Sequence, residues 1–267
     1  MLNRQLYVMF LRRNIRLVGI VSICSGLLFY LLAVIFPDMD PREAGLISAS
    51  WPTVMKDLFG DPAFAFADIY AWLNLQIFHI TFWAIYGVCA AILASRIIAR
   101  EMEEKTLEIL LSYPVSRAGV VVSGTAGVCT LMLLGVIPGI IGCGLGVLSS
   151  GGELHLSVIT QATVACLLVS LVCAAITVLM SACGGGQTLS VSLSLAVFSF
   201  LFLYSEMLSK MLPILRELKF LSPFHYYRAD EILIHRSFDY SALLFLTVYS
   251  LIPTITAVWV FSRKDLA

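Results

Sequence analysis

Five stretches of this chain contain no aspartate, glutamate, lysine or arginine, and each is long enough to cross a lipid bilayer. They comprise residues 17–37, 69–95, 118–152, 154–205 and 240–262. A transmembrane helix needs about 20 predominantly apolar residues. The fourth run contains 52 residues and therefore has to hold two helices. Three consecutive glycines inside it favour a turn over a helix and mark the break.

These runs predict an all-α membrane protein that forms a single transmembrane domain over residues 1–267. Hydrophobic residues make up 60% of the chain and charged residues 13%, whereas an average soluble domain has about 25% charged residues. The break between the fourth and fifth helices is expected at residues 184–186. The six transmembrane helices are expected at about residues 15–36, 71–96, 118–148, 157–183, 187–207 and 241–262.

The N-terminal segment is basic and amphipathic. Residues 1–13 can place Leu2, Leu6, Met9 and Phe10 on one helix face, opposite polar and basic side chains. This pattern predicts an N-terminal helix that lies in the membrane interface before the first span. Arginines ahead of an apolar run also occur in signal peptides. No Ala-x-Ala-like cleavage site follows, which favours an uncleaved anchor.

The distribution of basic residues predicts the orientation. With the N-terminus inside, six spans leave ten lysines and arginines on the inner side and seven on the outer side. Cytoplasmic loops carry an excess of these residues, so we expect both termini to be cytoplasmic. The formal net charge is zero, which gives no support for a nucleic-acid partner.

A charged, amphipathic segment at residues 100–117 separates the second and third spans. Opposite charges stand four residues apart in two pairs, Arg100 with Glu104 and Glu101 with Lys105, and such pairs support a helix. We expect this helix to lie at the membrane surface. It is either an ordinary interfacial loop helix or a docking helix for a cytoplasmic partner.

The ends of this helix can also be read from the sequence. Pro114 disfavours helical geometry at the residue before it, so the helix is expected over residues 100–113. Ser116 is suited to cap the helix that follows. Leu107, Leu110 and Leu111 fall on one face.

This segment resembles the first cytoplasmic loop of the type-2 ABC exporter permeases. The matching residues are Arg100, Glu101, Glu103, Glu104, Thr106, Leu107, Glu108, Leu110, Leu111, Pro114, Val115, Ser116 and Arg117. Lys105 stands where the family usually has glycine. Two weaker resemblances lie at residues 221–225 and 261–265.

The resemblance implies the membrane subunit of an exporter in the cytoplasmic membrane of a prokaryote. A separate cytoplasmic ATPase subunit would bind ATP and Mg²⁺, and a second permease subunit, identical or different, would complete the unit. This chain contains no phosphate-binding loop and no cofactor site of its own. The residues implied in coupling to the ATPase are Arg100, Glu101, Glu103, Glu104, Thr106, Leu107, Glu108, Leu111, Pro114 and Arg117.

Three polar residues in the second span are candidates for a substrate path. Asn74, Gln76 and His79 lie near its outer end, and polar residues inside a membrane are functional candidates by default. The alternative is hydrogen bonding between helices. On an ideal α-helix, Gln76 and His79 can share a face, whereas Asn74 and His79 cannot.

Other readings of the chain remain open at this point. A six-span membrane protein outside the ABC class, such as a secondary transporter or a scaffold, is the alternative, although the spans show no central charges and no obvious repeat. The seven cysteines indicate small apolar positions rather than disulfides or a metal site. Glycine pairs at 135/139 and 142/146 predict close helix packing, either within the bundle or at a dimer seam.

Overall fold

The computed structural model describes residues 3–36, 41–53, 56, 66, 68–107, 112, 115–209 and 217–264. Every regular element in this part of the chain is a helix, and six segments are long and apolar enough to span a membrane. These are Arg4–Val34, Ile69–Ser95, Arg117–Ser149, Leu156–Cys183, Gln187–Glu206 and Tyr240–Arg263. The prediction of an all-α protein with six transmembrane helices is confirmed.

Several spans are built from more than one helical element. The first span is α1 (Arg4–Val34). The second consists of α5 (Ile69–Leu73), the π-helix η1 (Asn74–Phe78) and α6 (Thr81–Ser95), and the third of α9 (Arg117–Gly135) and α10 (Ile137–Ser149). The last three are α11 (Leu156–Cys183), α12 (Gln187–Leu203) with the π-helix η2 (Tyr204–Leu208), and α16 (Tyr240–Arg263).

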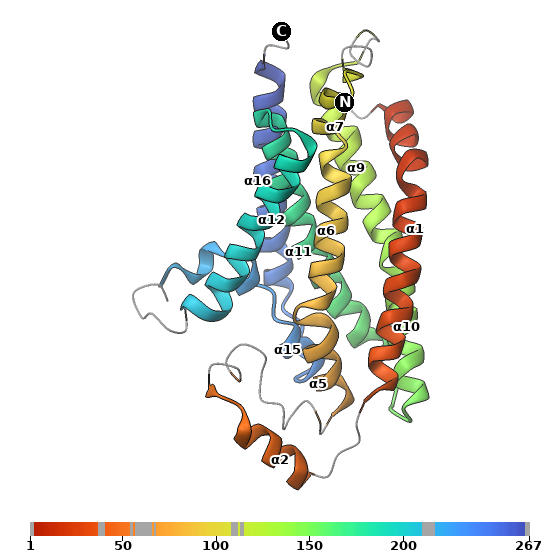
Figure 1. Cartoon of the computed structure of the whole chain (residues 1–267), viewed down its shortest axis with the longest axis vertical. Helices are drawn as coiled ribbons and strands as arrows, with labels where there is room; N and C mark the ends of the chain where they lie inside the picture. Colours follow the sequence, from red (N-terminus) through yellow and green to blue (C-terminus); the bar gives the residue numbers. More distant parts are fainter. Residues whose placement is uncertain are drawn as a thin grey trace.

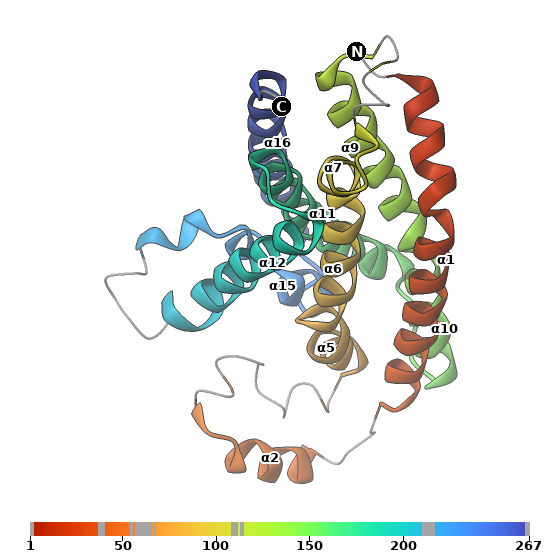
Figure 2. The same ribbon diagram turned by 45° about the horizontal axis from the view of Figure 1, so that its top comes forward.

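Short helices occupy the two ends of the bundle. Helix α7 (Ala99–Glu103) lies at the end that also carries both chain termini. Near the other end lie α2 (Pro41–Ser50) and α15 (Ala229–Leu233). The 3₁₀-helices η3 (Glu217–Leu221) and η4 (Pro223–His225) follow η2, which extends to one side of the bundle in both Figure 1 and Figure 2.

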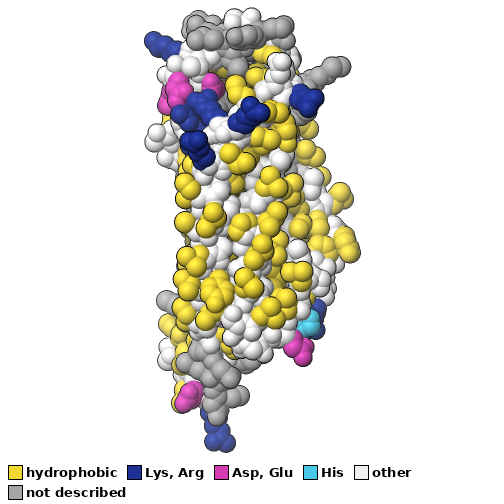
Figure 3. All heavy atoms as spheres, turned by 90° about the vertical axis from the view of Figure 1, so that its right-hand side faces the viewer, with side chains coloured by type: hydrophobic (Ala, Val, Ile, Leu, Met, Phe, Trp, Pro, Cys, Tyr) yellow, Lys and Arg dark blue, Asp and Glu magenta, His cyan; other side chains and the backbone are white. Residues whose placement is uncertain are grey.

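Helix α11 forms the centre of the bundle and is the most buried of the six spans. It contacts α6, α12 and α16, while α1 packs mainly against α9 and α10. Apolar side chains nevertheless cover much of the outer surface between the two ends, as Figure 3 shows for one face. Ile23 on α1 is 68% exposed and Ile255 on α16 is 65% exposed. Such a surface is suited to contact with lipid rather than water.

The N-terminal segment is part of the first span. Asn3 caps α1, because its Oδ1 accepts hydrogen bonds from the backbone N–H groups of Gln5 and Leu6 at 3.0 and 3.4 Å. The helix then continues without a break to Val34. The helix expected over residues 1–13 is therefore continuous with the first span and not separate from it in the described residues. The pattern of apolar and polar positions in this segment follows the helical period of the span itself.

The glycines of the third span allow close packing inside the bundle. A Cβ on Gly142 would overlap the backbone carbonyl oxygen of Gly26, and one on Gly26 would lie 2.6 Å from the carbonyl oxygen of Pro138. Side chains at these positions would separate α1 from α10. The structure thus supports packing within the bundle for these glycines. The span is interrupted at Val136, two residues before Pro138, which cannot donate a helical hydrogen bond.

The expected break between the fourth and fifth spans is confirmed. Helix α11 ends at Cys183, and Gly184 adopts a left-handed conformation with φ of +109°. Residues without a side chain adopt this geometry at little cost. Helix α12 begins three residues later, at Gln187.

Candidate coupling loop and a broken second span

Helix α7 ends in a compact turn centred on Lys105. The N–H of Thr106 donates to the carbonyl oxygen of Glu101 at 3.0 Å, and the N–H of Lys105 donates to that of Met102 at 3.2 Å. This pair of hydrogen bonds defines a Schellman motif, which requires a left-handed residue after the helix. Lys105 is that residue, with φ of +55°. The geometry explains why glycine would fit this position better than lysine.

The expected continuous helix over residues 100–113 is therefore wrong, because α7 stops at Glu103. Leu107, beyond the turn, is buried. Glu108, Leu110, Leu111 and Pro114 lie outside the described residues. Ser116 caps α9 as expected, since its hydroxyl oxygen accepts from the N–H of Gly119 at 3.1 Å.

Two glutamates of the loop bind an arginine of the first span. One guanidinium nitrogen of Arg13 contacts Oε1 of Glu101, and another lies 3.0 Å from Oε2 of Glu104. Glu104 also accepts from Arg100 at 2.7 Å, which confirms that expected pair. Glu101, however, pairs with Arg13 rather than with Lys105. Its side chain is only 11% exposed, so an unpaired charge there would be costly.

The hydrogen bonds from Arg100 and Arg13 lower the pKa of Glu104 below the ordinary value of 4.5. The carboxylate is therefore ionised at neutral pH and can hold both arginines. The side chain of Glu104 is 40% exposed, so solvent screens these pairs more than it screens the contact at Glu101.

A second contact joins the start of the loop to the first span. The guanidinium of Arg96, directly after α6, donates to Oδ1 of Asn14 at 2.7 Å. Asn14 is fully buried and donates from Nδ2 to the carbonyl oxygen of Phe10 at 2.8 Å. The loop is thus attached to α1 at two successive residues, Arg13 and Asn14.

Glu103 attaches the loop to the fifth span. Its Oε1 accepts a hydrogen bond at 2.8 Å from the N–H of Gln187, the first residue of α12. The N-terminus of a helix carries unsatisfied N–H groups and partial positive charge, which a carboxylate stabilises. A Cβ on Gly186 would overlap this carboxylate. Gly186 thus permits the contact.

The remaining matched residue, Arg117, joins α9 to the end of the last span. Its guanidinium donates to the carbonyl oxygen of Lys264, and the ammonium of Lys264 lies 3.3 Å from the carbonyl oxygen of Ala182 near the end of α11. A cation there satisfies a free helix carbonyl. Arg117 therefore has a role inside the bundle.

Sequence reasoning missed Arg13, Asn14 and Gln187 as partners of the loop. One signal pointed to the first: residues 1–37 contain arginines and no acid, whereas four glutamates lie between positions 101 and 108. The partners of Glu103 and Arg96 left no comparable signal. The described loop forms a charged junction, residues 96–107, that connects α6 to α1 and α12.

At the opposite end of the second span, the helix is broken around the three predicted polar residues. The N–H of His79 donates to the carbonyl oxygen of Asn74 at 2.8 Å, a π-type bond between residues five apart. Helix α6 starts anew at Thr81. Short π segments inside helices occur frequently at functional sites.

Side chains replace the backbone hydrogen bonds that this break removes. The hydroxyl of Thr81 donates to the carbonyl oxygen of Gln76, that of Tyr227 to Phe78, and the indole N–H of Trp83 to His79, all at 2.7 Å. Burial raises the pKa of Tyr227 well above its ordinary value, so its phenol stays a neutral donor. Three carbonyl oxygens at the break thus have side-chain donors.

An aromatic cluster holds one of these donors in place. The Trp83 ring lies 4.7 Å from that of Phe202 and 5.3 Å from that of Phe224, which belongs to the segment 221–225 noted for its family resemblance. Aromatic pairs at this spacing attract one another. The Ser-Pro-Phe segment thereby supports the broken span.

The π turn changes the relation between Asn74, Gln76 and His79. The expectation that Asn74 and His79 cannot share a face assumed an ideal α-helix, and it is wrong here because the π bond places them one turn apart. Oδ1 of Asn74 is buried without a hydrogen-bond partner among the described residues. The His79 ring packs edge-on against Phe202 at 5.9 Å. None of these three residues lines the hollow beside the N-terminal part of α1 or the one between α9, α11 and α16.

Comparison with known proteins gives the family. The model of an ABC-2 family transporter protein matches residues 19–266, which includes all six spans except the first part of α1. A search of curated proteins finds no match. This family supplies the membrane subunits of ABC transporters, so the non-ABC alternative is set aside. The match spans most of the sequence, and the chain belongs to the ABC-2 family of transporter proteins.

Proposed function

We propose that the chain is the permease subunit of an ATP-driven exporter in the cytoplasmic membrane of a prokaryote. A separate ABC ATPase, which binds ATP and Mg²⁺, docks on the 100–117 segment, and a second permease subunit, identical or different, completes the assembly. The main support is the charged junction 96–107, which connects the second span to the first and the fifth. Both termini and the loop lie on the cytoplasmic side.

The junction offers a physical route for the ATPase to act on the membrane helices. Nucleotide can shift the equilibrium between two states only through contacts that differ between those states. A push on α7 is carried to α1 through Arg13 and to α12 through Glu103. The second, first and fifth spans therefore respond together.

Docking and transmission can be separated by comparing two variants. Glu104→Arg reverses an exposed charge of the loop and also breaks its contact with Arg13, whereas Arg13→Gln breaks that contact and leaves the loop's own side chains unchanged. We expect Glu104→Arg to reduce copurification of the co-expressed ATPase at least about tenfold, equal to 1.4 kcal/mol. Arg13→Gln should retain the ATPase, and Glu217→Arg in η3 is the control. Full binding and coupled ATP hydrolysis in Glu104→Arg would exclude docking on this surface.

The orientation has its own test. In a variant without native cysteines, a single cysteine at Glu103 should react with a membrane-impermeant thiol reagent only after the cells are permeabilised. One at Lys219 should react in intact cells. The reverse labelling would place the charged junction outside and remove the proposed ATPase contact.

We further propose that Asn74, Gln76 and His79 lie on the substrate path. The supporting observation is the π segment, with a buried amide oxygen of Asn74 that lacks a partner in the described part of the chain. His79→Leu keeps bulk and removes polarity. If the site lines the path, the variant should assemble with its ATPase normally while substrate-stimulated ATP hydrolysis falls. Normal assembly with unchanged stimulation would exclude His79.

A further inference from the structure

The first span is longer than a bilayer core requires. Helix α1 has 31 residues, which corresponds to about 46 Å at 1.5 Å per residue. The hydrocarbon core of a membrane is about 30 Å thick. Roughly ten residues of α1 must therefore extend beyond the hydrocarbon or be accommodated by tilt.

The side chains identify which end extends. Arg4, Arg12 and Arg16 are exposed near the N-terminus of α1. Further along the helix, Ile20 and Ile23 are 65% and 68% exposed. The outer surface of the same helix thus changes from basic to apolar within about one turn. Figure 3 shows the same pattern on one face of the molecule, with lysines and arginines near one end and apolar side chains below them. This change marks the boundary between headgroups and hydrocarbon.

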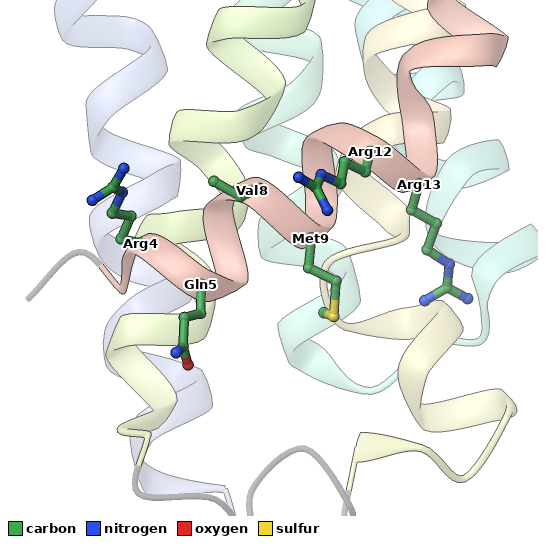
Figure 4. A pocket seen from close by; sticks show the side chains of 6 residues that line it. All are labelled: Arg4, Gln5, Val8, Met9, Arg12 and Arg13. Atoms are coloured by element: carbon green, nitrogen blue, oxygen red, sulfur yellow. The ribbon is translucent and has the colours of Figure 1, made fainter.

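The arginines of α1 divide into two groups. Arg13 is neutralised by Glu101 and Glu104. Arg4, Arg12 and Arg16 have no ion-pair partner within the residues that the structure describes. Figure 4 shows Arg13 pointing away from Arg4 and Arg12. The chain therefore supplies acidic partners to one side of the helix and leaves the other side basic.

Arg12 and Arg16 stand four residues apart, where side chains of a helix are neighbours. Like charges at this spacing repel, and an anion bound by both would remove the repulsion. Next to Arg12 lies an open hollow of about 810 Å³, lined by Arg4, Gln5, Val8, Met9, Arg12 and Arg13. Its lining combines guanidinium groups with apolar side chains, and Met9 is 47% exposed.

We propose that this face of α1 binds the phosphate headgroup of an anionic phospholipid. Guanidinium groups bind phosphate oxygens in a bidentate manner. The exposed side chains of Ile20 and Ile23, further along α1, are suited to contact the acyl chains. Arg12 lies at the centre of the site and Arg4 at its outer edge, and Arg16 stands one turn further along α1, beside the hollow. The proposal rests on α1 alone and is independent of the docking of an ATPase.

The test uses the full-length protein in detergent after lipid removal. Thermal unfolding is followed while phosphatidylglycerol or phosphatidylcholine with the same acyl chains is added. Phosphatidylglycerol should stabilise the native protein more than phosphatidylcholine. In Arg12→Gln/Arg16→Gln, the concentration for half of this effect should rise roughly 30-fold, or about fivefold per arginine. Arg12→Gln alone should give the fivefold change, which keeps the test valid if the double variant folds poorly.

Two control variants sharpen the result. Arg12→Lys/Arg16→Lys keeps both charges and should stay within about threefold of the native response. Arg263→Gln removes an exposed arginine from the same end of the bundle and should not change the response.

Three outcomes would overturn the proposal. The first is an unchanged response to phosphatidylglycerol in both glutamine variants. The second is an equal stabilisation by inorganic phosphate, which would indicate a site for a free anion. The third is a double variant that loses its ATPase but keeps the lipid response, which would assign the face to protein docking.

Discussion

The second span is anchored differently at its two ends. At the charged junction, ionised side chains that are partly exposed connect the loop to α1 and α12. At the π segment, neutral donors that are more deeply placed satisfy the carbonyl oxygens of the broken helix. Charged contacts of the first kind are weakened by salt and can be exchanged for contacts with a partner. Buried neutral hydrogen bonds are costly to lose and hold one conformation. The end at the charged junction can therefore respond to a partner, whereas the end at the π segment is rigid.

The largest effect on stability is expected at the rigid end. Tyr227→Phe keeps the ring and removes the hydroxyl donor to the carbonyl oxygen of Phe78, which is left with only the weak thiol donor of Cys166 at 3.8 Å. An unsatisfied buried acceptor costs about 1–3 kcal/mol, and thermal unfolding in neutral detergent measures the loss. Tyr226→Phe is the matched control, because its ring stacks on Phe245 at 4.7 Å and keeps that contact. Equal losses in the two variants would contradict the role of the hydrogen bond.

A smaller, salt-dependent effect is expected at the charged junction. Arg13→Gln removes the cation that faces Glu101 and Glu104. Since the Arg13 side chain is 38% exposed, screening reduces the loss to about 1 kcal/mol. The difference from the native protein should shrink in 1 M salt, whereas the loss in Tyr227→Phe should not. Arg12→Gln, without anionic lipid present, is the control. A salt-independent loss would show that Arg13 acts through packing.

The turn after α7 predicts a gain in stability. Lys105 has φ of +55°, a conformation that costs an L-residue with a side chain about 1 kcal/mol. Lys105→Gly should therefore stabilise the protein by about that amount, measured by thermal unfolding. Lys105→Ala keeps a Cβ and should give no comparable gain. If alanine stabilises as much as glycine, the gain comes from removing the charge and not from the turn.

The smallest effect concerns pH. The pKa of Glu104 is lowered by its arginine partners, so the stability it contributes is present above the ordinary value of 4.5 and is lost as the pH falls through the lowered value. The stability difference between the native protein and Arg13→Gln should stay constant from about pH 8 to pH 6. It should decrease only in more acidic solution. A decrease around neutral pH would point to a different titrating group.

The sequence was sufficient to predict the spans but not the contacts between them. Charge-free runs place every span end except the first close to its observed position, because burying a charge in lipid is costly whatever the partners are. The exception is the start of the first span, which was expected near residue 15 and lies at Arg4. The break at residues 184–186 followed from glycine alone. The prediction made the loop helix too long, because the residue at its left-handed turn position is a lysine and not a glycine. The π segment was missed because the helical spacing assumed 100° per residue throughout.

The sequence singled out several residues that connect spans, but not the partners of those residues. Glu101, Glu103, Glu104 and Arg117 were singled out through a family resemblance, and each contacts another span in the structure. Their partners are 84 to 147 residues away along the chain, and two of these partners are backbone groups. Periodicity and local spacing carry no information on such pairs. Only the tertiary arrangement of the helices brings them together.

Transmission of the ATPase's action requires that the loop move the first span through Arg13. The most direct test uses spin labels at Gln5 on α1 and Ser262 on α16, in a variant without native cysteines and in complex with the co-expressed ATPase. Electron–electron resonance then compares the distance between the labels with and without ATP and vanadate. We predict a nucleotide-dependent change in the native junction that is absent in Arg13→Gln while the ATPase remains bound. The same change in both proteins would contradict transmission through Arg13.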